Sequence, residues 1–242
     1  FNLHAIYMMM MDVMPPYKDL ELESEGCVYI RPEAQASLLA SDGKALTLYS
    51  NLDRSVEAIA RFSAKDAKRF REVYKECEEL SYASLIPATY TLPVPPVDYA
   101  VMLGKDPIGR RILELSEKTP LQILDEWGFE NPLLQTLVLH LVCMWGLEPE
   151  VTGMGYLVPL YLNRMLNMSL IRGGSHRFSS ALHRAIISHG GDVLESYAVT
   201  RIIVQNGAAK GVEVGLTNAE HLDRKTFAAK VVITSTDPVT TF

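Results

Sequence analysis

The stretch IRGGSHRFSSALHRAIISHGGDVLESYAVTRIIVQNGAA, residues 171–209, decides the fold of this chain. It predicts a helix from about Ser175 to His189 between two glycine pairs, because glycine is favoured where a helix ends. Short apolar strands follow, and Asn206-Gly207 suits a two-residue hairpin turn. This order is typical of a segment in which a helix packs on a sheet and returns the chain to that sheet.

Two further segments are predicted as strands on either side of the hairpin. DVLES (192–196) follows the second glycine pair, and AKVVITST (229–236) lies near the end of the sequence. The VVIT core of this second segment is continuously apolar, which is typical of a strand buried on both faces of a sheet. In open α/β sheets, ligands bind at the carboxyl ends of such strands.

The first two thirds of the chain are predicted to be mostly helical. One hairpin is predicted at residues 34–49, where Asp42-Gly43 forms the turn between two apolar runs. Three helix starts carry a capping residue, because a side-chain oxygen there can accept a bond from an unpaired backbone N–H. These capping residues are Ser63, Thr119 and Asn131.

Two segments within this helical region are interpreted separately. Residues 86–98 hold four prolines and are predicted to form an extended connector, with a hinge or the edge of a lid as the alternative, because proline breaks a helix and restricts the residue before it. The helix that begins at Pro132 has few polar residues, which predicts that it is almost fully buried or lines an apolar cavity. His140 within it is interpreted as a core or cavity-edge histidine, with proton transfer as the lesser alternative.

The composition argues against several classes of protein. A net charge of −6 with interspersed basic residues provides no lysine and arginine cluster for nucleic acid. Three distant cysteines favour the cytoplasm or another reducing compartment over a disulfide framework, and their spacing predicts no metal site. His176 and His183 are spaced too far apart along one helix for a metal pair and are predicted to face solvent.

The opening FNLHAIYMMMMDVM is apolar but lacks the basic region and cleavage site of a signal peptide, and it is too short to span a bilayer. A buried strand or helix is favoured, and peripheral contact with a membrane or a tunnel-lining role is the alternative. Both ends of the sequence are interpreted as cuts rather than natural ends.

The last third of the chain carries an ordered set of motifs that resembles the flavin-dependent amine oxidase and phytoene desaturase superfamily. The match is closest to the phytoene-desaturase-like oxidoreductases. No single motif is specific, but the ordered set extends over residues 171–238. The motifs are Gly173-Gly174, Ala181-Leu182, Gly190-Gly191, Val199 with Ile202, GAAKGV at 207–212, and VVITSTDP ending at Pro238.

This resemblance implies a mixed fold, between α+β and α/β. Residues 1–168 would form a helical cap or substrate region with a small β-sheet, and residues 169–242 the returning part of a Rossmann-like FAD domain. The sequence contains neither the glycine-rich dinucleotide turn of the family nor its C-terminal flavin segment. The resemblance assigns cofactor-binding roles to Gly173, Gly174, Val199, Thr234, Ser235 and Thr236, with the backbone of Val199 beside the adenine edge.

The resemblance therefore implies part of an FAD-dependent oxidoreductase that dehydrogenates, desaturates or isomerises an apolar substrate by hydride transfer to flavin. It places Arg177 near the flavin or the substrate, although a solvated arginine is the simpler interpretation. Trp145, Tyr156 and Tyr161 are candidates for an apolar substrate cavity, with a role in the core as the alternative. Two other functions stay open: a truncated, non-catalytic binding or assembly subunit, and one chain of a split flavoenzyme whose partner chain supplies the missing FAD-binding part.

Overall fold

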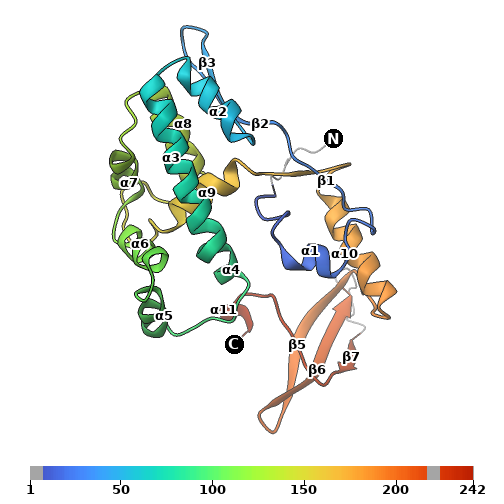
Figure 1. The fold of residues 1–242 in the computed structure, drawn as a ribbon. Coiled ribbons are helices and arrows are strands. Elements are labelled where there is room, and N and C mark those ends of the chain that lie inside the picture. The colour runs from blue at the N-terminus through green and yellow to red at the C-terminus, as the bar shows by residue number, and fades with distance from the viewer. Residues whose placement is uncertain (1–7, 217–223, 242) are drawn as a thin grey trace. The chain divides into compact units, whose positions relative to one another are not determined.

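The computed structural model describes residues 8–216 and 224–241 (Figure 1). The chain divides into two compact units, one that runs to Ala185 (unit 1) and one that begins at Ile186 (unit 2). Helices and three small antiparallel sheets make up the described residues, so the predicted α+β class is confirmed. No helix within the described ranges is long and apolar enough to cross a membrane.

Unit 1 is built mainly of helices, with two short two-stranded sheets. The antiparallel pairs are β1 with β4 and β2 with β3. A π-helical turn, η1, continues α3 into α4. The elements are α1 (Pro15–Asp19), β1 (Tyr29–Ile30), β2 (Ala34–Leu39), β3 (Ala45–Tyr49), α2 (Leu52–Ala60), α3 (Ala64–Leu80), η1 (Ser81–Leu85), α4 (Ile86–Thr89), α5 (Pro96–Leu103), α6 (Pro107–Ser116), α7 (Pro120–Trp127), α8 (Pro132–Cys143), α9 (Leu157–Met165), β4 (Leu170–Ile171) and α10 (His176–Ser188), which continues into unit 2.

The main core of unit 1 surrounds α3, which lies beside α9 in Figure 1. Phe70 of α3 is fully buried and stacks on Tyr74, and its ring also lies 6.2 Å from that of Phe129. Cys77 belongs to the same core, and burial raises the pKa of its thiol well above the ordinary value. Aromatic and aliphatic side chains from distant segments therefore hold this unit together through apolar burial.

The predicted capping residues all begin helices. Ser63 accepts the N–H of Asp66 at 3.1 Å, and the Asp66 carboxylate is buried, where it accepts the N–H groups of Glu130 and Asn131 at 2.9 and 2.8 Å. Asp66 thus ties the start of α3 to the loop before α8. Thr119 and Gln122 form a reciprocal capping box at the start of α7.

Replacing Thr119 by alanine is expected to lower the free energy of unfolding by about 1 kcal/mol, because the N–H of Gln122 loses its acceptor. Thr119→Ser is the matched control, since it keeps the hydroxyl. Urea unfolding followed through the fluorescence of Trp127, which is buried at the other end of α7, measures both variants. An alanine variant as stable as the serine variant would show that the cap contributes nothing.

Two predictions for unit 1 are wrong. Residues 86–98 contain α4 and the start of α5, because Pro87 follows the π-helical turn, where the wider backbone tolerates the missing N–H of proline. Helix α8 is exposed along one face, and His140 is exposed on it rather than buried in the core. The polar residues Gln135 and Thr136 precede His140 on that same face.

Unit 2 contains a three-stranded antiparallel sheet in the order β5-β6-β7. The strands are β5 (Tyr197–Gln205), β6 (Ala208–Leu216) and β7 (Lys225–Ala228), and a short helix, α11 (Pro238–Thr241), follows. Asn206 and Gly207 connect β5 to β6 with positive φ angles of 52° and 75°, as the predicted hairpin turn requires. Figure 1 shows this hairpin as the longest pair of strands.

The predicted strands at 192–196 and 229–236 are wrong. Neither segment forms a strand in the described residues, and Val231 and Ile233 are 71% and 92% exposed. A buried parallel strand needs hydrogen-bonding neighbours on its edges, and an apolar sequence cannot supply them. In α10, Ala181 and Ala185 are buried whereas Ile186 is exposed.

Candidate functional site

A pocket in unit 2 gathers three of the residues to which the resemblance assigned a cofactor role. It has a volume of about 460 Å³, and we call it the threonine pocket. Val199 reaches it from β5, and Thr234 and Thr236 reach it from the segment after β7. Ser235 does not line it. The full lining is Val199, Thr200, Arg201, Ile202, Val204, Val212, Val232, Ile233, Thr234, Thr236 and Thr241.

The backbone of β5 is irregular where it meets this pocket. The pairing of β5 with β6 shifts register between Val199 and Arg201, so that Thr200 lies in a bulge. Its hydroxyl donates to the carbonyl of Glu213 at 3.2 Å. Because β5 is an edge strand of its sheet, one side of its backbone has no neighbouring strand among the described residues.

Three threonine hydroxyls form a chain along one side of the pocket. The Oγ1 atoms of Thr234 and Thr236 are 2.6 Å apart, and those of Thr236 and Thr241 are 2.5 Å apart. Thr241 also donates to the carbonyl of Asp237 at 2.8 Å. Hydroxyls can rotate and can both donate and accept, so this chain is able to hydrogen-bond a sugar.

The charge at the threonine pocket comes from one arginine. Arg201 is largely exposed and lies 3.3 Å from the carboxylate of Glu213, which also pairs with Arg224 at 3.0 Å. Glu213 is therefore shared between two cations, and the cluster retains a net positive charge. Such an exposed cation contributes little to stability but favours anions nearby.

The predicted glycine pair lies in unit 1. Gly173 and Gly174 have φ angles of 81° and 102°, a conformation that favours glycine. A Cβ on Gly173 would lie 3.3 Å from Nε of Arg177, so the arginine side chain runs along this bare backbone. Arg177 itself is exposed. The pair therefore leaves room beside the backbone, and Arg177 occupies part of that room.

The threonine pocket fits one portion of an FAD molecule. Val199, Ile202 and Val212 present apolar side chains against which a flat base can pack, and Thr234 and Thr236 present hydroxyls for a ribose. No glycine-rich turn opens a helix beside this pocket in the described part of the chain, and such a turn usually binds the pyrophosphate. The apolar side chains suit a base and the threonine hydroxyls suit a ribose, whereas the phosphates of FAD would need other residues.

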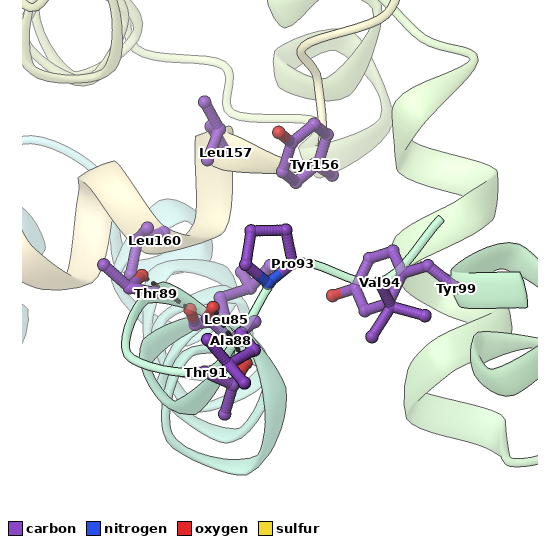
Figure 2. Close-up of a pocket in the computed structure, with 11 residues that line it drawn as sticks. Leu85, Ala88, Thr89, Thr91, Pro93, Val94, Tyr99, Tyr156, Leu157 and Leu160 are labelled. Carbon is purple, nitrogen blue, oxygen red and sulfur yellow. Dashed lines mark hydrogen bonds between the residues drawn. The ribbon is translucent and has the colours of Figure 1, made fainter. Parts of the chain in front are cut away.

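Unit 1 contains a second pocket, of about 320 Å³, which we call the tyrosine pocket (Figure 2). Its walls come from η1, α4, the proline-rich segment after α4, α5 and the start of α9. No charged side chain is among its lining residues. They are Leu85, Ala88, Thr89, Thr91, Leu92, Pro93, Val94, Tyr99, Tyr156, Leu157 and Leu160.

Of the three residues predicted for an apolar cavity, Tyr156 lines the tyrosine pocket. Trp145 and Tyr161 do not line it. Trp145 is 43% exposed, and its indole N–H donates to Sδ of the buried Met165 at 2.9 Å. Tyr161 is half-buried, and burial raises the pKa of its hydroxyl.

The sequence interpretation missed most of the tyrosine pocket. Leu92 and Pro93 belong to residues 86–98, which were predicted to form an extended connector, and Tyr99 directly follows that segment. An available signal was the charge pattern, because Asp98 is the one charged residue between Leu80 and Lys105. A long uncharged segment rich in proline and aliphatic residues is a reasonable wall for an apolar site.

A buried arginine network was also missed. Arg164 on α9 is fully buried and forms an ion pair with Asp12. Its Nε donates to the carbonyl of Met9 at 2.8 Å, and its Nη1 donates to the hydroxyl of Tyr82 at 3.1 Å. This network attaches the segment around Asp12 to α9 and η1, although the three lie far apart in the sequence.

His176 and His183 are both exposed, as predicted. The described residues contain no group of three histidine, cysteine, aspartate or glutamate side chains that could hold a metal ion.

Comparisons with known proteins give two informative relatives. The chain is 54% identical over 246 residues to a protein of Castellaniella defragrans that is named as a limonene dehydrogenase subunit, a match that covers all of this chain and 44% of that protein. It is 24% identical over 262 residues to pyridine nucleotide-disulfide oxidoreductase domain-containing protein 2 of Rattus norvegicus, covering 93% of this chain and 43% of that protein. The chain thus spans less than half the length of these relatives. No protein-family model matches it.

Proposed function

We propose that this chain is part of one subunit of a multi-chain, FAD-dependent oxidoreductase that dehydrogenates, desaturates or isomerises an apolar substrate. The observation that carries the proposal is the 54% identity to a limonene dehydrogenase subunit along the whole chain. The second relative, named for a pyridine nucleotide-disulfide oxidoreductase domain, supports redox chemistry in the same direction. The reason to propose FAD as the cofactor is the resemblance of the motif order to that of phytoene-desaturase-like oxidoreductases.

Bound FAD would supply the hydride acceptor, which protein side chains do not provide. The residues of this chain would bind the FAD and orient the substrate beside it. The backbone of Val199 would pair with the adenine edge, and Thr234 and Thr236 would hydrogen-bond the ribose. Gly173 and Gly174 would let their backbone approach the cofactor, and Arg177 would lie near the flavin or the substrate. The division into a substrate region (1–168) and a partial FAD domain (169–242) is part of this proposal.

A second function is favoured by particular observations. The first relative is named as a subunit, and Val193 and Val231 are exposed on apolar segments that form no strand in the described part of unit 2. Both observations support a chain that is completed by further sequence or by another protein chain. In that case this part serves in assembly, or contributes one portion of a flavin site that a partner chain finishes.

The proposal is tested on the complete protein that carries this chain, purified with its partner chains. A flavin absorption spectrum that bleaches when limonene is added without oxygen is the expected result. A complex without flavin, before and after added FAD, would contradict the cofactor. Flavin that limonene leaves oxidised would contradict an apolar substrate of this size but not the cofactor.

The Thr234→Val, Thr236→Val double variant tests the threonine pocket. We expect its dissociation constant for FAD to rise roughly tenfold to a hundredfold, because two neutral hydrogen bonds are lost in a partly buried site. Ser235→Ala is the matched control, since Ser235 lies between the two threonines and does not line the pocket. Equal dissociation constants for the double variant and the control would remove the threonines from the cofactor site.

A further inference from the structure

The tyrosine pocket is uncharged but is not purely apolar. Four of its lining residues carry hydroxyls: Thr89, Thr91, Tyr99 and Tyr156. The two threonine hydroxyls are already engaged, because Thr89 donates to the carbonyl of Leu85 at 3.0 Å and Thr91 donates to that of Ala88 at 3.2 Å. The threonines therefore offer a ligand mainly their methyl groups.

The two tyrosine hydroxyls are different. Within the part of the chain that the structure describes, neither Tyr99 nor Tyr156 hydrogen-bonds another residue through its hydroxyl. Figure 2 shows the two rings reaching the pocket from separate elements, Tyr99 from α5 and Tyr156 from the start of α9. Both side chains are half-buried. Each presents a polar atom at the edge of a site that is otherwise aliphatic.

We infer that the tyrosine pocket binds an uncharged, mainly hydrocarbon molecule that carries a single hydroxyl or carbonyl oxygen. Leu85, Leu157 and Leu160 would bury the carbon skeleton, and the hydroxyl of Tyr99 or Tyr156 would hydrogen-bond the oxygen. A volume of about 320 Å³ lies at the lower end of ligand pockets, which favours a small molecule of about ten carbons.

The buried side of the lining disfavours a charged ligand. A carboxylate or ammonium group beside Leu85 and Leu160 would lose its water without gaining a counter-ion, and such desolvation is costly. A hydrocarbon without oxygen would fit but would leave both tyrosine hydroxyls without a ligand partner. This ligand class goes beyond the proposed function, because binding in the tyrosine pocket does not need redox chemistry and limonene, the hydrocarbon used to test that function, carries no oxygen.

Three probes that share one carbon skeleton test the inference on the complete protein: p-cymene, p-isopropylbenzyl alcohol and p-isopropylbenzoate. Calorimetric titration without oxygen is expected to rank the alcohol first and the hydrocarbon about fivefold weaker, with no binding of the carboxylate, because one neutral hydrogen bond separates the first two. Flavin absorbance is recorded in the same samples. Absence of flavin or of bleaching counts against the proposed redox function alone.

Tyr99→Phe and Tyr156→Phe remove the hydroxyls and keep the rings. One of the two variants is expected to bring the alcohol down to the affinity of the hydrocarbon while leaving the hydrocarbon unchanged. Ala88→Phe, which fills the pocket, should abolish binding of both, with circular dichroism as the check on folding. Equal affinities for alcohol and hydrocarbon in the wild type, tight binding of the carboxylate, or binding that survives Ala88→Phe would each overturn the inference.

Discussion

Arg164→Met is expected to lower the free energy of unfolding of unit 1 by about 3–4 kcal/mol. The guanidinium is fully buried, and its removal breaks the ion pair with Asp12 and takes the donor from the carbonyl of Met9. Breaking a buried pair by removing one partner is strongly destabilising, because the remaining groups stay desolvated. Methionine keeps an unbranched side chain in the space, so the loss reports the polar network rather than a cavity.

Arg31→Met is the matched control, since Arg31 also pairs with Asp12, at 2.5 Å, but its side chain is 34% exposed. Its loss should cost less than about 1 kcal/mol, as is usual for ion pairs near the surface. Urea unfolding followed through Trp127 fluorescence compares the two variants. Equal losses for Arg164→Met and Arg31→Met would show that burial of the arginine adds nothing.

Helices α3, α7 and α8 of unit 1 could be predicted because the caps at their first turns are encoded locally. Thr119 with Gln122 and the glycine at 128 mark both ends of α7 within ten residues of each other. Capping depends on the few residues around one turn, so a single sequence is enough. The helical content of residues 86–98 could not be predicted in this way, because a π-helical turn upstream relieves the constraint imposed by Pro87.

The strands show the opposite case. The β5-β6 hairpin was predictable because its turn, Asn206-Gly207, is local. An apolar run such as 231–234 predicts a strand only on the assumption that neighbouring strands are present, and the described chain supplies none. A strand is a property of a pair rather than of a segment, so sequence pattern alone cannot decide it.

The two candidate sites also differ in how far the sequence could predict them. Val199, Thr234 and Thr236 could be named because a family resemblance fixes positions by motif, and the three do line one pocket. Tyr99 and Tyr156 are 57 positions apart (156 − 99), and no periodicity connects them. Their meeting depends on how α5 and α9 pack, and that packing is decided by the core as a whole.

Gly211→Ala is expected to destabilise the sheet of unit 2 by about 3 kcal/mol or more. A Cβ on Gly211 would lie 2.0 Å from the carbonyl oxygen of Phe227 on β7, so strand β7 has to move away from β6. Overpacking of this kind adds to the loss of four backbone pairings between the two strands, which include Gly211 with Ala228.

Gly207→Ala in the same hairpin is the matched control. Its φ of 75° strains an alanine by about 1–2 kcal/mol, but nothing lies within 4 Å of the added Cβ. Because both tryptophans lie in unit 1, hydrogen exchange of the β6 and β7 amides is the measurement that reports on this sheet. We expect fast exchange along both strands in Gly211→Ala and near-normal exchange in Gly207→Ala.

Protection that is equal in the two variants would mean that β7 does not pack against Gly211 in solution. The threonine pocket would then lose one of its supports, because Val212 lines that pocket and pairs with Phe227 in the same register.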